Sequence, residues 1–251
     1  MAPKRIVLTH DMLTGAVGDQ WSDAELREAV NLLSRADGRF PAGVRSLPPD
    51  LVRAIQRERL LAAMLVGVNE LGYRSLTVQD VLSRAGVSRP TFYEQFKDKE
   101  DCFLATFDAS AARLHKCLHA ALSEAPAPWR DRLRAGLRAL LGFVAEDPNP
   151  ARTIVVEARA SSPAGLRRRD EMMDGFATCI DAEARKALSD PPSAIAAVGV
   201  VGGIESVLYS RLQRNATDEL ETLLPSLMYF AVLPYEGHDA ASEELGGAAL
   251  T

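Results

Sequence analysis

The stretch LTVQDVLSRAGVSRPTFYEQFKDKE, residues 76–100, sets the architecture of the N-terminal half of this chain. Thr77 can cap the start of a helix, and Asp80 stands three residues later, where its carboxylate can complete a capping box. Apolar residues at helical spacing then form one stripe, made of Val78, Val81, Leu82 and Ala85. Gly86 supplies the left-handed residue that ends a helix sharply. The pattern predicts a short helix followed by a tight turn.

A second short helix is predicted directly after this turn. Val87 can fill the gap between the helices, Ser88 can cap the second one, and Pro90 lies in its first turn, where an N–H is not needed. Phe92 and Phe96 are four residues apart and point into the core. The residues left on the outside are Arg89, Thr91, Tyr93 and Gln95. Because a short helix with a packed back and a polar front suits the major groove, the pair is predicted to be a helix-turn-helix.

Longer helices are predicted on both sides of this motif. The preceding helix follows Pro48-Pro49, covers about residues 50–71 and ends before Gly72. The following helix is capped by Asp98 and carries an apolar face from Phe103 to Leu118. Lys99 stands at its start, where it is expected to be free to reach a DNA phosphate.

The motif resembles the DNA-binding segment of TetR-family (tetracycline-repressor-like) regulators. The resemblance rests on Ala-Gly-Val-Ser at 85–88, Thr-Phe-Tyr at 91–93 and Phe-Lys-Asp-Lys-Glu at 96–100. It covers about 50 residues with the long helix before the motif. It implies an all-α homodimer, in which an N-terminal three-helix helix-turn-helix domain binds DNA and a C-terminal helical bundle serves ligand binding and dimerisation.

The resemblance also implies which residues contact DNA. Thr77 and Tyr93 match positions that touch phosphates, and Lys99 matches a phosphate-binding lysine of the next helix. Ser88, Arg89, Pro90 and Thr91 match the positions nearest the base edges, and Lys97 completes the predicted surface. Arg89 is the strongest candidate for a base contact, because arginine can bind guanine O6 and N7 together. The alternative is that Arg89 clamps a phosphate.

Four segments are predicted along the chain. Residues 1–46 form an extension with one helix, started by the capping box of Ser22 and Glu25; residues 47–122 form the DNA-binding domain; residues 123–236 form the ligand-binding and dimerisation domain; and residues 237–251 form a disordered tail. The family's domain usually begins near the N-terminus, so the extension is a departure. Its helix is expected to pack on the core or on a partner subunit, and Lys4 and Arg5 could instead form a minor-groove arm.

The second half reads as about five helices separated at Pro148 and Pro150, Ser161-Ser162-Pro163, Pro191-Pro192 and Asn215. The candidate ligand-lining residues are Phe143, Met172, Met173, Phe176 and Tyr209, although residues of these types are more often plain core than pocket wall. Arg167, Arg168 and Arg169 could grip an anion, although a solvated helix face is the simpler interpretation. The resemblance implies that the last two helices, about 192–214 and 217–233, form the dimer interface.

Composition excludes several other classes of protein. Three cysteines without a CxxC spacing fit a reducing cytosol, and the N-terminus lacks the apolar run of a signal peptide. No uncharged apolar stretch of membrane-spanning length is present, so a cytoplasmic protein without a membrane partner is expected. His115 and His119 have a spacing that can bind a metal, but no third ligand is evident, so neither a metal nor another cofactor is predicted.

The charge distribution gives weaker support to DNA binding than a basic domain would. The net charge is −5, yet residues 1–124 hold equal numbers of acidic and basic residues, so the whole deficit lies in the second half. DNA binding must therefore rest on a few well-placed cations. No catalytic constellation can be assigned, and the sequence predicts a non-enzyme.

The predicted function is that of a ligand-responsive transcriptional regulator. We expect a repressor that binds a palindromic operator as a homodimer and responds to an unknown small-molecule effector. The alternatives are an activator, or a small-molecule carrier or enzyme with a vestigial DNA-binding domain.

Overall fold

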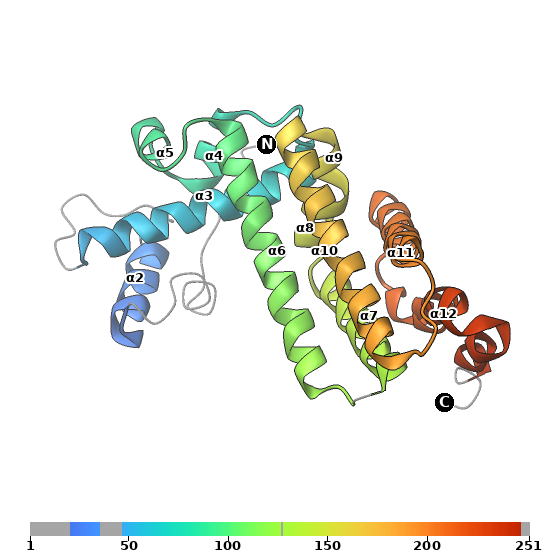
Figure 1. Ribbon diagram of the computed structural model, residues 1–251. Coiled ribbons are helices and arrows are strands. Elements are labelled where there is room, and N and C mark those ends of the chain that lie inside the picture. The colour runs from blue at the N-terminus through green and yellow to red at the C-terminus, as the bar shows by residue number, and fades with distance from the viewer. Residues whose placement is uncertain (1–20, 36–46, 127, 247–251) are drawn as a thin grey trace. The chain divides into compact units, whose positions relative to one another are not determined.

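The computed structural model describes residues 21–35, 47–126 and 128–246, and within these ranges every regular element is a helix (Figure 1). The all-α prediction is therefore confirmed. The elements are α2 (Asp23–Arg35), α3 (Pro49–Leu71), α4 (Val78–Ala85), α5 (Arg89–Gln95), α6 (Lys99–Glu124), α7 (Trp129–Glu146), α8 (Pro148–Arg152), the π-helix η2 (Thr153–Glu157), α9 (Ala158–Ala160), α10 (Pro163–Ala187), α11 (Ile195–Gln213), the 3-10 helix η3 (Leu220–Leu223) and α12 (Leu224–Gly246).

The chain divides into two compact units, residues 1–106 and 107–251. The division falls within α6, which is earlier than the expected boundary near residue 122. The sequence places α6 with the helix-turn-helix because its first turns carry the Asp98 cap and Phe103. The later turns of the same helix contribute to the core of the second unit, and no break in the sequence marks that change.

The two short helices of the first unit have the caps that the sequence predicts. Thr77 Oγ1 accepts from the Asp80 N–H at 3.2 Å, and the Thr77 N–H donates to the Asp80 carboxylate at 2.9 Å. These hydrogen bonds from Thr77 hold the pKa of Asp80 below its usual value. Gly86 ends α4 with φ 65°, and Ser88 Oγ accepts from the Thr91 N–H at the start of α5. The capped ends and the left-handed glycine fix the turn between the helices.

The core of the first unit is made by side chains of α3, α4, α5 and the start of α6. The fully buried side chains include Leu60, Met64, Val81, Phe92 and Phe103. α3 ends at Gly72, which has φ 76°, as the sequence predicts. Gly67 allows a close approach within this core, because a Cβ there would lie 2.7 Å from Leu76 Cδ1.

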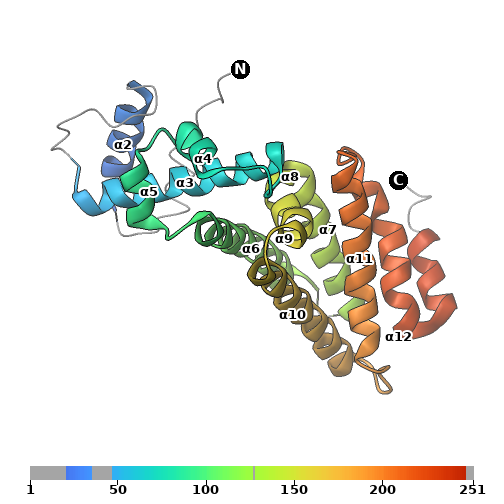
Figure 2. The ribbon, with the colours of Figure 1, turned by 90° about the horizontal axis from the view of Figure 1, so that it is seen from above.

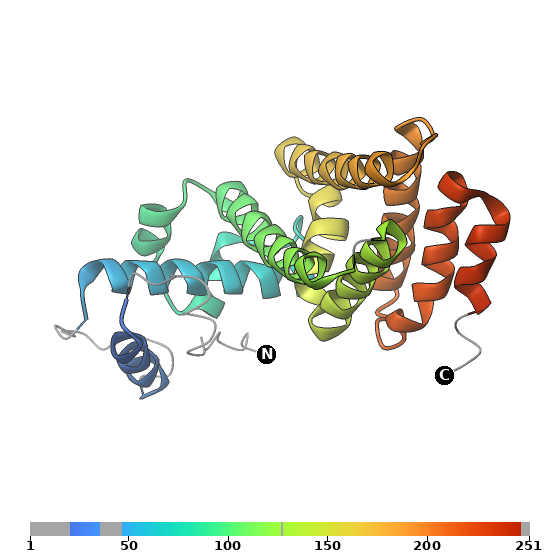
Figure 3. The same cartoon turned by 60° about the horizontal axis from the view of Figure 1, so that its bottom comes forward.

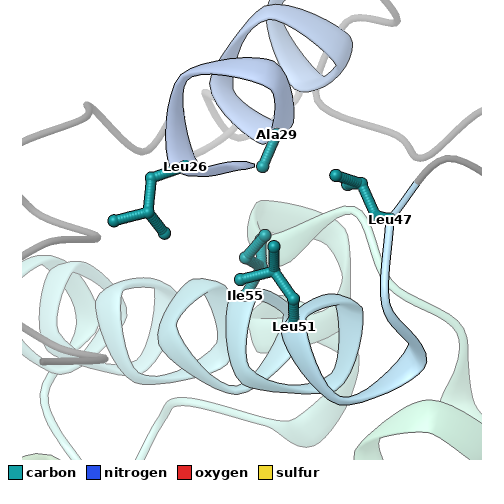
Figure 4. Packing of buried hydrophobic residues seen from close by; sticks show 5 residues of the cluster. All are labelled: Leu26, Ala29, Leu47, Leu51 and Ile55. Carbon is teal, nitrogen blue, oxygen red and sulfur yellow. The ribbon is translucent and has the colours of Figure 1, made fainter. Parts of the chain in front are cut away.

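The helix of the N-terminal extension packs on the first half of α3. Leu26 and Ala29 of α2 face Leu51 and Ile55 of α3, with Leu47 beside them (Figure 4). All five are buried, and Trp21 and Val30 pack around them. The Ser22–Glu25 capping box is formed, with the Ser22 N–H donating to Glu25 at 2.8 Å. α2 is therefore a fourth helix of this unit, whereas Lys4 and Arg5 lie outside the described residues.

The second unit is a bundle in which α10 packs against α11, and α7 packs against α12 (Figure 2). The predicted breaks fall between helices. Asp147 caps α8 before Pro148, Ser162 caps α10 before Pro163, and Asn215 adopts φ 53° after α11. Between α8 and α10 the chain contains a π-helical turn, η2, which periodicity alone did not predict.

The C-terminal segment differs from the expected disordered tail. Residues up to Gly246 belong to α12, which is kinked at Gly237, where φ is 82° (Figure 3). After the kink the chain turns back, and the two parts of the helix lie side by side. Ion pairs bind both parts to α7, because Arg130 binds Glu236 before the kink and Glu243 after it, and Arg134 binds Glu244. These long-range pairs could not be read from the glycines that suggested a tail.

Within the described residues, α11 is the one helix long and apolar enough to cross a membrane by length and composition. This is weak evidence, because core helices of other proteins pass the same test. α11 also carries the buried Glu205, which is bound to two arginines. That arrangement is typical of a helix inside a protein core.

Leu26→Ala is expected to loosen α2 from α3. Because Leu26 is fully buried between the two helices, its truncation should lower the stability of this packing by about 2–5 kcal/mol. Hydrogen exchange of the α2 amides should then become faster. Arg27→Ala is the matched control, because the Arg27 side chain is 70% exposed. Equal exchange rates in the two variants would contradict the packing role of α2.

Candidate DNA-binding surface and ligand cavity

α5 presents a polar face to solvent and an aromatic face to the core. Arg89, Pro90 and Tyr93 are exposed, Tyr93 by 50%, while Phe92 and Phe96 are buried. Thr91 is half-buried and shares a hydrogen bond with the Ser88 hydroxyl at 2.8 Å. The residues predicted nearest the base edges therefore lie together on one helix and its cap. Ser88 and Thr91 take part in capping α5, so the exposed Arg89 is the cationic side chain of this face.

Two contacts fasten α5 to α3. The Gln95 side chain donates to the Arg53 carbonyl at 3.2 Å, and the Arg57 guanidinium lies over the Phe96 ring at 4.6 Å from its centre. A seven-residue helix is too short to be stable alone, so these contacts and the buried Phe92 maintain it. Gln95, expected on the outside, is half-buried because of this bond.

The contacts to α3 also bring two cations to the predicted surface that the sequence interpretation missed. The Arg53 side chain is 65% exposed beside the end of α5, and Arg57 stands one turn further along α3. Their spacing of four residues on one helix was the available signal.

Lys99 is not free to reach outward, contrary to the expectation. Its ammonium donates to the Tyr73 and Leu76 carbonyls, both at 2.9 Å, and lies 4.3 Å from the centre of the Tyr73 ring. Partial burial lowers its pKa. Lys99 therefore fastens the loop between α3 and α4, which sequence spacing could not reveal because the loop is more than 20 residues away. Lys97, in contrast, is exposed.

The second unit encloses an apolar cavity of about 470 Å³. Its walls come from α6, α7, α8, η2, α10 and α11, and most of the lining side chains are leucine, isoleucine and valine. Gly136 of α7 also lines the cavity, and its lack of a side chain leaves space there. Such a cavity can hold a sizeable apolar ligand.

Polar side chains of the cavity lining gather in two clusters. In the first, Arg132 and Lys186 each bind Glu183 at 2.8 Å. Hydrogen bonds from Lys186 and Arg132 hold the pKa of Glu183 below its usual value. In the second, the buried Glu205 of α11 binds Arg159 and Arg169, each at 2.5 Å.

Two of the five predicted ligand-lining residues, Met173 and Phe176, line this cavity. Phe143 and Met172 are buried but are not part of its wall, and Tyr209 stacks with Arg159, 4.9 Å from the ring centre. The sequence missed the leucines of α6 and α7 because a cavity wall and a packed core have the same apolar periodicity.

The arginine run and the histidine pair both have defined surroundings. Arg168 pairs with the exposed Asp108, and Arg169 pairs with the buried Glu205. Two of the three arginines are therefore bound to carboxylates of this chain. Arg167 is exposed. The His115 ring packs edge-on against Phe176 at 5.6 Å, and no cluster of three or more metal-ligating side chains occurs within the described ranges.

The described chain combines a helix-turn-helix with a helical unit that contains an apolar cavity. Residues 61–106 match the family described as "Bacterial regulatory proteins, tetR family". This match confirms the resemblance of the helix-turn-helix segment to TetR-family regulators.

Two relatives with curated names are transcriptional regulators of Mycolicibacterium smegmatis. The chain is 28% identical over 138 residues to the HTH-type transcriptional activator FasR of Mycolicibacterium smegmatis, covering 55% of this chain and 63% of that protein. It is 31% identical over 126 residues to the HTH-type transcriptional regulator EthR of the same organism, covering 50% of this chain and 56% of that protein. The chain therefore matches less than two thirds of the length of either relative.

The chain also matches solved structures with the same fold, and these matches span nearly the whole length of the solved chains. One is the transcriptional regulator FadR from Bacillus subtilis in complex with stearoyl-CoA, with a TM-score of 0.63 and 20% identity, covering 71% of this chain and 98% of that one. Another is the fatty acid degradation regulator FadR from Bacillus halodurans, with a TM-score of 0.62 and 19% identity, covering 70% of this chain and 97% of that one. At this identity the likeness establishes the fold.

Lys99→Met is expected to lower the free energy of unfolding of the first unit by about 1.5–3 kcal/mol, because two carbonyls lose a charged donor. Urea unfolding followed by circular dichroism measures the change. Lys97→Met is the matched control, and its exposed side chain predicts no comparable loss. Equal stability of the two variants would show that Lys99 does not fasten the loop.

Proposed function

We propose that this protein is a ligand-responsive transcriptional regulator that binds operator DNA through α5. The observation that carries the proposal is the exposed polar face of α5, held by a buried aromatic back, in a chain that also encloses an apolar cavity. The names of its curated relatives support a regulator and a non-enzyme, and we propose that it acts in the cytoplasm, where such a regulator would meet its operator.

The DNA contacts are proposed to come from a small set of residues. Arg89 reads base edges, with Ser88, Pro90 and Thr91 beside it, while Thr77, Tyr93 and Lys97 contact phosphates. Arg53 and Arg57 add positive charge from α3. Lys99 supports this surface through the loop that it fastens.

The active form is proposed to be a homodimer formed through α11 and α12. These helices expose apolar side chains: Ile195, Val198, Phe230 and Leu233. Gly199 and Gly202 leave open space on α11, where a second helix can approach closely. Two-fold symmetry then predicts a palindromic operator with half-sites about 34–36 Å apart, or a multiple of that.

The proposed ligand is a long-chain acyl compound. The cavity is lined mainly by apolar side chains, and the FadR structure from Bacillus subtilis was solved with stearoyl-CoA. Ligand binding changes DNA affinity if it favours one of two states of the dimer. Repression is the leading proposal, and activation is the second, because FasR is named an activator. The position of the operator relative to the promoter it controls distinguishes them.

Arg89→Ala is expected to weaken operator binding by about 1–3 kcal/mol and to relax base preference. Lys97→Ala should weaken binding to all sequences alike and reduce the salt slope by about 1. Selection of genomic fragments by the purified protein supplies the operator, and fluorescence anisotropy measures the affinities. Arg167→Ala is the control, because this arginine is exposed in the second unit. Unchanged binding by both N-terminal variants would refute the proposed surface.

Val198→Glu is expected to shift the protein from dimer to monomer, because it places a charge on the apolar face of α11. Sedimentation velocity measures the shift. Leu166→Glu is the matched control, since Leu166 of α10 is exposed to a similar extent, 41% against 49% for Val198. A dimer that survives Val198→Glu would exclude this interface.

Gly136→Leu is expected to abolish the ligand response while retaining operator binding. Its side chain would enter the cavity, and the added Cβ meets nothing closer than Leu122 Cδ2 at 3.8 Å. Operator binding is measured with and without stearoyl-CoA. Gly142→Leu is the control, because Gly142 is on the same helix, has open space and does not line the cavity. A full response in Gly136→Leu would mean that the ligand binds elsewhere.

A further inference from the structure

The two polar clusters of the cavity differ in their exposure to solvent. In the Arg132–Glu183–Lys186 cluster the side chains are 29%, 35% and 73% exposed. In the Glu205 cluster, Arg159 is 39% exposed, but Arg169 is 13% exposed and Glu205, the member that lines the cavity, is 7% exposed. The first cluster therefore forms a rim that solvent reaches, and the second is an inner polar wall.

The clusters also lie far apart along the cavity. α10 lines the cavity from Met173, one turn after Arg169, to Lys186 near its end. At 1.5 Å per residue, residues 173 and 186 are about 20 Å apart along the helix axis. The wall between them is apolar, from Ile180 on α10 to Leu133 and Leu140 on α7.

The charges at the two ends favour one orientation of an anionic ligand. At the rim, Arg132 and Lys186 share one carboxylate, so one positive charge is in excess. At the inner wall, Arg159 and Arg169 are balanced by Glu205 and Asp170, and the carboxylate of Glu205 borders the cavity. A negatively charged head group is attracted to the excess positive charge at the rim, whereas the balanced inner wall offers it no such attraction.

Glu205, which lines the cavity, has accepting capacity left. Its Oε1 accepts one hydrogen bond, from Arg169 Nε at 2.9 Å, while Oε2 receives Arg159 and the second nitrogen of Arg169. A carboxylate oxygen can accept two. A purely alkyl chain would cover this oxygen without satisfying it, at a desolvation cost. A hydroxyl would instead donate to it.

From these observations we propose that the cavity selects a long-chain acyl ligand with a hydroxyl at the far end of its chain, bound with its anionic head at Arg132 and Lys186 and its hydroxyl on Glu205. The inference rests on the proposed function of the cavity as an acyl-ligand site. Glu205 is the residue that distinguishes the hydroxylated chain from the plain one.

The test compares matched ligands on the unaltered full-length protein. Hexadecanoic acid and 16-hydroxyhexadecanoic acid are titrated by isothermal calorimetry, together with the 14- and 18-carbon pairs and the coenzyme A thioesters of each, because either head group carries negative charge. At the best chain length the hydroxylated member should bind about tenfold more tightly, as expected for a hydrogen bond to a charged acceptor. Equal or weaker binding of the hydroxylated member at every length overturns the inference.

Glu205→Gln tests the residue itself. The amide keeps the size of the side chain but is a neutral acceptor, so the preference for the hydroxylated chain should fall severalfold while the plain acid still binds. Asp170→Asn is the matched control, because Asp170 pairs with Arg169 on the exposed side and should leave the preference intact. A full preference in a folded Glu205→Gln variant overturns the role of Glu205. If that variant does not fold, the ligand series alone decides.

The outcome also separates this inference from the proposed function. Binding of the plain acids without a hydroxyl preference overturns the inference and leaves the acyl-ligand proposal standing. If no member of either series binds, both are overturned.

Discussion

Burial of the aromatic back of α5 is the interaction on which the DNA-binding unit depends. A helix of seven residues has too few internal hydrogen bonds to persist in water. Phe92 is completely buried, and Phe96 lies beneath the Arg57 guanidinium. Loss of a buried phenylalanine costs about 3–5 kcal/mol, which exceeds what any cap can restore. The direction in which Arg89 and Tyr93 point therefore follows from the packing of their neighbours on the opposite face of the helix.

Several cations that look available in the sequence are used to hold elements together. Lys99 fastens the loop between α3 and α4, Arg84 pairs with Glu70, and Arg169 pairs with Glu205. Half-buried ions need partners, because a charge removed from water without one is costly. The DNA-binding unit has little excess positive charge. This use of lysine and arginine therefore leaves fewer cationic side chains to bind DNA phosphates. Binding as a dimer would double that small set.

The cavity of the second unit combines an apolar wall with charged ends. Ion pairs at Glu183 and Glu205 fasten α7 to α10, and α9 and α10 to α11. They allow helices to stand apart around a space that side chains do not fill. The same charged side chains make the two ends of the cavity different. The rim has an excess positive charge, and the inner wall has a hydrogen-bond acceptor. In the proposed ligand complex, structural and recognition roles thus fall on the same residues.

The sequence by itself determined the local structure: the caps at Thr77, Ser88 and Asp98, the left-handed Gly86 and the buried Phe92 are set by neighbours within a few residues. It also predicted the helical class and the faces of α5. The tertiary structure decided what depends on distant contacts. Lys99 turned inward to carbonyls more than 20 residues away, and the expected tail up to Gly246 became a helix held by arginines of α7. The cavity is also a feature that only the tertiary structure decided. Apolar periodicity shows which face of a helix is buried, but not whether a neighbouring side chain fills the space against that face.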